Sequence, residues 1–320
     1  MRSCHAEPLC SECMVYLFLS YTERKMSKKI LLIINPVAGK MKSKNALFNI
    51  VNVFCKNDFK VSVAITSCRG HATEIVEKEG ADFDIVACCG GDGTLNEVVK
   101  GMMQGGHETP IGYIPAGSTN DFANSIGLSS DIKAAAEAIA TGSPCKLDIG
   151  SFGSVYFTYI ASFGAFTSAS YTTPQETKNA VGHMAYILEG IKDLSSIKPV
   201  HVRIETENEV FENEYIFGGI ANSTSVGGIV KLKPELVDMS DGLFEVVLIK
   251  NPKNLNNLNS IIMALLTSEY MNSDMIDCFK ASNLRFSCET SVPWTVDGEY
   301  ANGGTSFTIR NLKQKLTLIK

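Results

Sequence analysis

The sequence predicts two domains, an α/β domain followed by a β-rich domain. In the first half of the chain, apolar runs that suit buried strands alternate with stretches of helical spacing. This order is typical of an open sheet with helices on its faces. After Asp148 the pattern changes to alternation of apolar and polar residues, which favours strands with one buried face. The length of 320 residues agrees with two domains.

Strands and helices follow one another in the first half. The continuous apolar run at 30–34 predicts a strand buried on both faces, and Pro36 ends it because proline has no N–H to donate. The same patterns predict the other elements of this domain: strands at 61–65, 83–88 and 111–114, and helices at 44–56, 71–79 and 95–103. We assign residues 26–148 to the α/β domain.

The second half contains many short strands. Alternating residues and turn signals predict strands at 200–204, 209–220, 243–249, 284–288, 292–296, 305–309 and 315–319. Two stretches of helical spacing, near 176–194 and 256–271, interrupt them. We assign residues 149–304 to the β-rich domain, and we leave open whether the final strand, within 305–320, returns to the first domain.

Composition excludes several classes of protein. The formal net charge of -5 argues against a nucleic-acid binder, which needs concentrated Lys and Arg. Runs of 18 apolar residues are absent, so no transmembrane helix is expected. The chain has ten cysteines, of which Cys88 and Cys89 lie in an apolar strand and point to opposite faces. Most of the cysteines are interpreted as small buried residues of a reducing, cytoplasmic protein.

The first 25 residues differ from the rest. The apolar stretch at 14–19 is too short to cross a membrane and follows acidic rather than basic residues, unlike a signal peptide. Cys10 and Cys13 form a CxxC pair near Cys4, but a zinc site lacks its second ligand pair. Met26 precedes two lysines and an apolar strand, so we expect residues 1–25 to be a non-native or disordered extension.

A glycine-rich string at 89–98 follows a buried strand and opens a helix. Glycines let the backbone approach phosphate closely, and a helix N-terminus offers free N–H donors. Asp92 in this turn suits Mg²⁺, which prefers oxygen ligands; the alternative is a tight turn with Asp92 as a helix cap. The P-loop string GxxxxGK[ST] and the dinucleotide string GxGxxG are both absent.

The string GGDGTLNEV at 90–98 resembles the signature of the diacylglycerol kinase catalytic domain, which sphingosine kinases and bacterial lipid kinases share. NAD kinases also carry GGDGT, but the string at 115–123 resembles the lipid-kinase pattern PxGTxNDFA, with Ser118 in place of the usual Thr. Five further strings match in family order: 35–39, Thr66 with 70–72, 222–228, 238–243 and 296–299. The resemblance implies an α/β nucleotide-binding domain, a β-sandwich lipid and metal domain, and an active site in the cleft between them.

The resemblance also implies roles for residues. The expected ATP ligands are Asn35, Pro36, Thr66, Gly90, Gly91, Asp92, Gly93, Thr94, Asn96 and Ser118. Asp241, with the backbone carbonyls of Asp238 and Leu243, resembles the family's Mg²⁺ site, which Asp92 and Asp121 would join through water. Grouped acids repel one another without a cation, which favours a metal there. Without the family context, Asp241 and the glycine after it favour a hairpin turn.

Asp297 and Glu299 match the family motif that supplies the catalytic base. At positions i and i+2 of an extended strand they share one face, so one can act as the base while the other orients it or the substrate. We place Asp297 first and leave Glu299 open as the base. The alternative is again a turn, because Asp-Gly favours hairpins. Trp294, the only tryptophan, is more typical of a core residue than of a lipid contact.

Together these residues predict an ATP- and Mg²⁺-dependent lipid kinase, most simply one that converts diacylglycerol to phosphatidic acid. Three alternatives stay open: a kinase for another hydroxylated lipid (sphingoid base, isoprenoid alcohol or phosphatidylglycerol), an NAD kinase, and a non-catalytic lipid- or nucleotide-binding regulator. Retention of all the acidic residues argues against the last. We expect a cytoplasmic enzyme with peripheral contact at the inner face of the membrane; a homodimer is left open.

Overall fold

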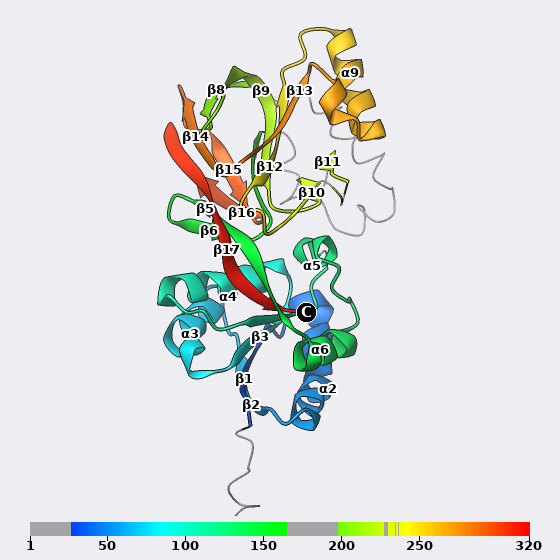
Figure 1. Cartoon of the computed structure of the whole chain (residues 1–320), viewed down its shortest axis with the longest axis vertical. Helices are drawn as coiled ribbons and strands as arrows, with labels where there is room; N and C mark the ends of the chain where they lie inside the picture. Colours follow the sequence, from blue (N-terminus) through cyan, green and yellow to red (C-terminus); the bar gives the residue numbers. More distant parts are fainter. Residues whose placement is uncertain (1–26, 119, 165–197, 227–229, 234, 236) are drawn as a thin grey trace, which may run out of the picture.

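The computed structural model describes residues 27–118, 120–164, 198–226, 230–233, 235 and 237–320. The expected extension at 1–25, with its cysteines, and the expected helix at 176–194 lie outside the described residues. Within the described part, two domains lie one above the other along the long axis (Figure 1).

The first domain contains a parallel sheet in the order β4-β3-β1-β2. Its strands are β1 (Lys29–Ile34), β2 (Lys60–Ile65), β3 (Ile85–Gly90) and β4 (Ile111–Pro115). Its helices are η1 (Ala38–Met41), α2 (Lys42–Lys56), α3 (His71–Glu79), η2 (Gly80–Asp82), α4 (Asp92–Gly105), α5 (Asp121–Ser125) and α6 (Ile132–Thr141). The element order confirms the predicted alternation of strands and helices. Strand β3 is buried along its whole length, as its apolar run predicts.

Helices cover both faces of this sheet. Cys88 packs in the core beneath α3 and α4, whereas Cys89 packs in the core beneath α2 and α6. The two thiols therefore point to opposite faces, as the sequence predicts. The α/β layering brings the carboxyl ends of β3 and β4 to one edge, where ligands bind in open sheets of this kind.

The second domain is mostly antiparallel. Its strands are β5 (Pro144–Phe152), β6 (Val155–Phe157), β7 (Ile160–Gly164), β8 (Val200–Glu205), β9 (Val210–Ala221), β10 (Ser225–Val226), β11 (Val230–Lys231), β12 (Phe244–Lys250), β13 (Ile276–Ala281), β14 (Asn283–Cys288), β15 (Pro293–Val296), β16 (Glu299–Asn302) and β17 (Ser306–Ile319). The helices α9 (Leu255–Thr267) and η5 (Tyr270–Asn272) replace the single helix expected at 256–271. Trp294 packs among Phe152, Phe163 and Phe286, so it belongs to the core.

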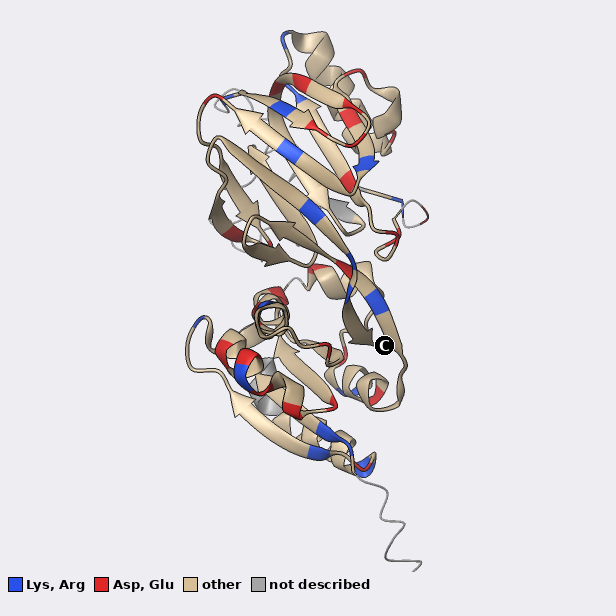
Figure 2. Ribbon diagram, turned by 60° about the vertical axis from the view of Figure 1, so that its left-hand side comes forward, with Lys and Arg blue, Asp and Glu red and all other residues tan. Residues whose placement is uncertain are grey.

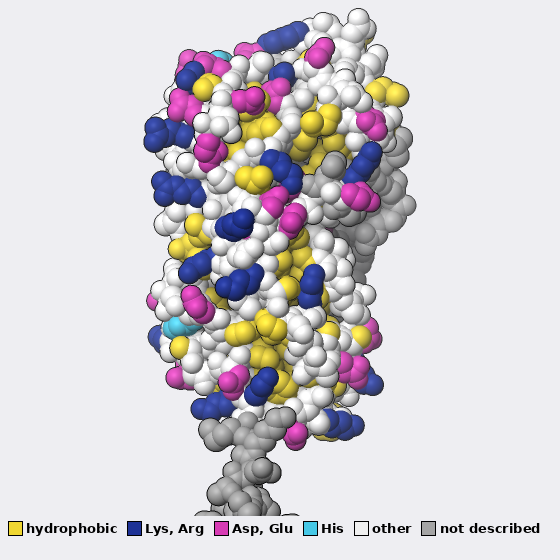
Figure 3. Space-filling view, viewed as in Figure 1, with side chains coloured by type: hydrophobic (Ala, Val, Ile, Leu, Met, Phe, Trp, Pro, Cys, Tyr) yellow, Lys and Arg dark blue, Asp and Glu magenta, His cyan; other side chains and the backbone are white. Residues whose placement is uncertain are grey.

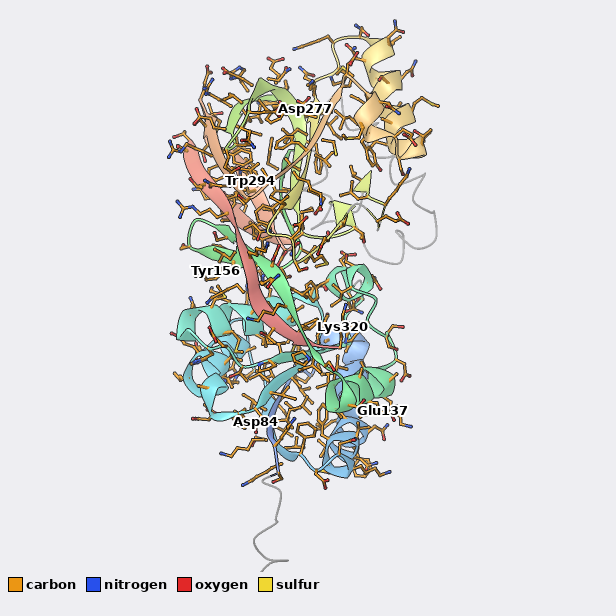
Figure 4. The ribbon with its side chains drawn as sticks, in the orientation of Figure 1. Asp84, Glu137, Tyr156, Asp277, Trp294 and Lys320 are labelled. Atoms are coloured by element: carbon orange, nitrogen blue, oxygen red, sulfur yellow. The ribbon has the colours of Figure 1, made fainter. Side chains whose placement is uncertain are left out.

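Strands β5 and β17 run from one domain into the other (Figure 1). They pair from Ile309 opposite Phe152 to Ile319 opposite Pro144. Near its end β17 also pairs with β4, and Lys320 lies in the first domain (Figure 4). The strands expected at 305–309 and 315–319 are therefore one strand, interrupted by a register shift between Leu312 and Leu316. The boundary expected after Asp148 falls within β5.

Asp148 fixes this crossing point. Its carboxylate is fully buried and accepts hydrogen bonds from the backbone N–H groups of Gly242, at 2.7 Å, and Gln314, at 2.7 Å. Gln314 has a positive φ of 53°, which belongs to the irregular part of β17. These two donors satisfy the buried carboxylate with hydrogen bonds. Asp148 thus joins the turn before β12 to the bulge of β17.

Candidate active site

Two glycine turns meet at the carboxyl edge of the parallel sheet. Gly90 pairs with Pro115, and the chain then passes through Gly91 on one side and Gly117 on the other. A Cβ atom on Gly117 would lie 2.5 Å from the Cα of Gly91, and one on Gly90 would collide with the side chain of Thr94. Only glycine allows this backbone-to-backbone approach.

A cleft of about 510 Å³ opens above these turns. Its lining includes most of the expected nucleotide ligands: Asn35, Pro36, Thr66, Gly91, Gly93, Thr94 and Ser118. Helix α4 begins at Asp92, so its N-terminus, with the N–H donors of a first turn, lies beside the cleft. Gly90, Asp92 and Asn96, which were also expected as ligands, are not part of this lining.

Asp92 joins the two glycine turns. Its carboxylate accepts hydrogen bonds from the backbone N–H of Asp121, at 3.0 Å, and of Phe122, at 3.3 Å. It therefore receives the first turn of α5 rather than capping α4, whose N-cap is Gly91 without a side-chain hydrogen bond. Burial and, to a smaller degree, the charge of Asp121 raise the pKa of Asp92 to about 6, against the opposing effect of these hydrogen bonds.

Asn120 shapes the second turn, a role that the motif comparison does not assign. It adopts a left-handed backbone with φ of 53° and caps its own loop. Its side-chain oxygen accepts from Gly117 N–H at 2.9 Å, and its amide donates to the Gly117 carbonyl at 3.1 Å. Asparagine tolerates this region better than most residues. The only sequence signal is an Asn placed three residues after a Gly.

On the other side of the cleft, Asp297 and Gly298 form a two-residue hairpin loop. Both have positive φ, 45° and 84°, and Val296 pairs with Glu299 across the turn. This geometry corrects the expectation that Asp297 and Glu299 share one face of an extended strand. The Asp-Gly pair favours the hairpin, so the alternative reading of this string describes the backbone correctly.

The Asp297 carboxylate is enclosed, with only 5% of the residue exposed. It accepts backbone N–H bonds from Thr158 at 2.6 Å, Tyr159 at 3.1 Å and Ile160 at 3.0 Å. The Thr158 hydroxyl donates to it at 2.9 Å, and the Asn96 amide donates from helix α4 at 2.8 Å. Burial raises the pKa of Asp297, and the hydrogen bonds it accepts oppose the shift. Asn96 thus contacts the second domain instead of the cleft.

Glu299, in contrast, lines the cleft at the start of β16. Its side chain is 49% exposed and forms an ion pair with Arg69 of the first domain, at 2.6 Å between Oε2 and Nη2. Acidic residues, drawn red in Figure 2, occur on both sides of the junction between the domains. Of the two expected candidates for the base, Glu299 is the one whose carboxylate contacts the cleft.

Tyr159 is within the electrostatic influence of three carboxylates, and no motif points to it. Burial raises its pKa well above the usual value, and the negative charges of Asp297, Asp92 and Asp121 raise it further. The phenol therefore stays protonated and can donate a hydrogen bond. These three acids come from both domains, which makes Tyr159 a junction residue.

The turn at 238–243 carries two acidic residues, Asp238 and Asp241. Asp241 accepts the Leu243 N–H at 2.8 Å and forms an ion pair with Lys280 at 3.1 Å. Lys280 also contacts Glu245 at 3.1 Å, whose burial raises its pKa to about 7. Within the described residues no three acidic, His or Cys side chains gather as metal ligands. The oxygen atoms of this turn are of the kind that Mg²⁺ prefers. The Asp241 carboxylate, which would hold the ion, already pairs with Lys280.

The comparisons with known proteins agree with this geometry. Residues 29–152 match the family model described as the diacylglycerol kinase catalytic domain, and residues 160–320 match the YegS C-terminal NAD kinase beta sandwich-like domain. A diacylglycerol kinase of Bacillus subtilis (strain 168) is 33% identical over 276 residues, covering 85% of this chain and 90% of the relative. The chain belongs to the diacylglycerol kinase catalytic-domain family. The resemblance seen in the motifs and the fold class it implies are confirmed.

Other relatives extend the agreement. A diacylglycerol kinase of Staphylococcus haemolyticus (strain JCSC1435) is 34% identical over 294 residues, covering 91% of this chain and 88% of the relative. A crystal structure of a diacylglycerol kinase from Bacillus anthracis str. Sterne has the same fold, with a TM-score of 0.71, 22% identity and coverage of 92% and 98% of the two chains. Membership of this family identifies the chain as an ATP-dependent lipid kinase.

The surface adds two facts. Among the described residues, none of the helices is both long and apolar enough to cross a bilayer. On the face shown in Figure 3, Lys and Arg side chains are interspersed with acidic ones over both domains and form no single basic patch. General attraction to a polyanion is therefore not a property of this face.

Proposed function

We propose that this lipid kinase transfers the γ-phosphate of ATP to the hydroxyl of diacylglycerol and so forms phosphatidic acid. The observation that carries the proposal is the cleft, where the glycine turns of the first domain and the Glu299 carboxylate of the second face one space. Phosphoryl transfer needs a phosphate cradle and a proton acceptor near one another. Relatives named diacylglycerol kinase support the choice of lipid.

In this proposal ATP phosphates lie against the N-terminus of α4, with Asn35, Thr66, Thr94 and Ser118 supplying polar groups from the cleft wall. Asn35 donates to the Thr94 hydroxyl at 3.1 Å, which orients both side chains beside the glycine turn. Preorganised donors of this kind stabilise the charge that develops on a transferring phosphoryl group.

Mg²⁺ is the proposed metal, which neutralises phosphate charge when bound. Asp241, with the carbonyls of Asp238 and Leu243, would hold it, and Asp92 and Asp121 would join through water. Support comes from the oxygen-only donors of this turn. Asp238 is itself engaged, because its carboxylate accepts the Ser240 hydroxyl at 2.7 Å, which leaves the main-chain carbonyls as the relevant donors.

Asp297 and Glu299 are the proposed source of the base. The contact of Glu299 with the cleft favours this carboxylate as the group that accepts the proton of the lipid hydroxyl. Asp297 then acts behind it, because its hydrogen bonds to the chain at 158–160 fix the hairpin from which Glu299 projects. This order reverses the one preferred from the sequence.

The enzyme is further proposed to work in the cytoplasm, at the inner face of the membrane. Helix α9 supports a peripheral contact: it carries no charged side chain and exposes Leu255, Met263 and Leu266. Exposed apolar residues on an uncharged helix favour the bilayer boundary. Co-flotation with lipid vesicles tests this contact. Sedimentation of the purified enzyme without vesicles tests whether it is a homodimer.

Transfer of ³²P from labelled ATP into lipids in mixed micelles tests the function. The panel contains diacylglycerol, a sphingoid base, an isoprenoid alcohol and phosphatidylglycerol, with Mg²⁺ present, and NAD as a separate acceptor. Label in phosphatidic acid that Glu299→Gln abolishes supports the proposal. Label in another lipid would change the substrate, and ATP binding without transfer to any acceptor would support the regulator instead.

A further inference from the structure

Arg69 and Glu299 form an ion pair that bridges the two walls of the cleft. Arg69 lies in the loop between β2 and α3, Glu299 begins β16, and both line the cleft. The distance between Arg69 Nη2 and Glu299 Oε2 is 2.6 Å. The two residues belong to different domains, so the pair bridges the domains at the cleft itself.

Arg69 is also the only Lys or Arg among the cleft-lining residues that the structure describes. Among the described lining residues, Arg69 stands against two acidic side chains, Glu97 and Glu299. The Glu97 carboxylate is held in place, because it accepts hydrogen bonds from the N–H groups of Gly70 at 2.8 Å and Ala72 at 3.2 Å.

The hydrogen bonds that Glu97 accepts hold the loop backbone but leave the Arg69 side chain free to turn. The Arg69 side chain is 76% exposed and that of Glu299 is 49% exposed. An ion pair in such contact with water stabilises a protein little. A guanidinium binds phosphate oxygens through two parallel hydrogen bonds, which makes phosphate the stronger partner. Nucleotide phosphate in the cleft therefore displaces Glu299 at small cost.

We propose that Arg69 is a phosphate ligand, and that Glu299 pairs with it until phosphate binds. In the free enzyme the ion pair joins the domains and neutralises Glu299. When a nucleotide polyphosphate enters, the guanidinium moves to it and the Glu299 carboxylate is released toward the acceptor hydroxyl. The exchange makes Glu299 available only after the phosphate donor is bound. This inference rests on the proposed function, which places a nucleotide in the cleft.

Calorimetric titration with ATP, ADP and adenosine tests the exchange. Arg69→Gln is expected to weaken ATP and ADP binding about tenfold or more, the effect of losing a charged hydrogen bond. Adenosine, which has no phosphate, should bind the variant and the wild type alike. The matched control is Arg203→Gln, which removes the exposed ion pairs of Arg203 with Glu205 and Glu212 but lies away from the cleft, and it should leave ATP binding unchanged.

Glu299→Gln should change ATP affinity in the opposite direction. If Glu299 competes with phosphate for Arg69, this variant binds ATP more tightly, by about twofold to fivefold, the modest effect of freeing an exposed ion pair. In the double variant with Arg69→Gln the gain disappears. Weaker ATP binding by Glu299→Gln, or an equal loss of ATP and adenosine binding in Arg69→Gln, would overturn the exchange.

The lipid assay separates this inference from the proposed function. Wild-type enzyme that phosphorylates diacylglycerol while Arg69→Gln binds ATP normally refutes the exchange alone. Wild-type enzyme that binds no nucleotide refutes both. Arg69→Lys is the conservative variant: it keeps the charge without the fork of donors, so it should recover part of the lost ATP affinity.

Discussion

The two walls of the cleft are built on different principles. In the first domain the wall is main chain: glycine turns and a helix N-terminus meet so closely that Gly117 has no room for a Cβ atom beside Gly91. In the second domain the wall is a hairpin that presents side chains, with Asp297 enclosed and Glu299 exposed. One wall is fixed by local backbone geometry, and the other by contacts between residues far apart in the sequence.

This difference determines how each wall fails. A change in the main-chain wall meets backbone atoms that cannot move aside. A change in the hairpin wall leaves buried donors without an acceptor, because the N–H groups of Thr158, Tyr159 and Ile160 all point to one carboxylate. The hairpin wall should therefore lose the most when a single side chain is removed.

Asp297→Ala is expected to have the largest effect. Three buried N–H groups and the Asn96 amide lose their acceptor, so we expect the free energy of unfolding to fall by about 4 kcal/mol. Transfer to lipid should fall about a thousandfold or more, because the hairpin that carries Glu299 loses its support. Thermal unfolding and the ³²P assay measure the two effects.

Asp297→Asn is the control for this prediction. Its side-chain oxygen still accepts hydrogen bonds, so about half of the lost stability should return. A variant with alanine that unfolds like the wild type would show that the hairpin wall does not depend on this carboxylate.

Gly117→Ala should have the second-largest effect, and it acts on the main-chain wall. The new Cβ lies 2.5 Å from Gly91 Cα, and separating the two turns is expected to cost about 3 kcal/mol of stability. Nucleotide binding should be lost with it. Gly93→Ala is the matched control, because a Cβ at Gly93 meets no atom within 4 Å. It should fold normally, and any loss of ATP affinity then reports contact with phosphate alone.

The same contrast explains what the sequence can predict. The glycine string after a buried strand is local information, and it indicates the sheet edge, the turn and the helix N-terminus correctly. The enclosure of Asp297 depends on Asn96 and Thr158, which lie 201 and 139 residues away, so no local pattern reports it. Arg69 was missed for the same reason, because its partner Glu299 lies in the other domain.

Strand boundaries show this limit too. The domain boundary was expected after Asp148, yet β5 continues through this residue to Phe152. An acidic side chain such as that of Asp148 is disfavoured in a buried position. It is buried nonetheless, because the N–H groups of Gly242 and Gln314 converge on it. The bulge at Gln314, with its positive φ, likewise made one long strand look like two. Distant hydrogen-bond partners, rather than local propensity, decide both cases.

Asp92 should make the stability of the protein depend on pH, with an effect of intermediate size. Its pKa of about 6 lies above the usual 3.8, so the folded state favours the protonated form. The stability linked to this proton is full below pH 3.8 and is lost as pH rises through 6. Allowing for residual solvent contact, the loss is about 2 kcal/mol. Asp92→Asn, unfolded by urea between pH 4 and 7 with a chelator present, should lack this slope. An equal slope in both proteins would assign it to another group.

Ser118→Thr should have the smallest effect, and it sharpens the description of the main-chain wall. Ser118 replaces the Thr of the lipid-kinase pattern that the string at 115–123 resembles, and it is exposed at the cleft. The added methyl group meets solvent, and the hydroxyl is kept, so the KM for ATP should change by less than about twofold. Ser118→Ala removes the hydroxyl and should raise KM several-fold more than the Thr variant does. If alanine and threonine behave alike, the wall binds phosphate through its backbone only.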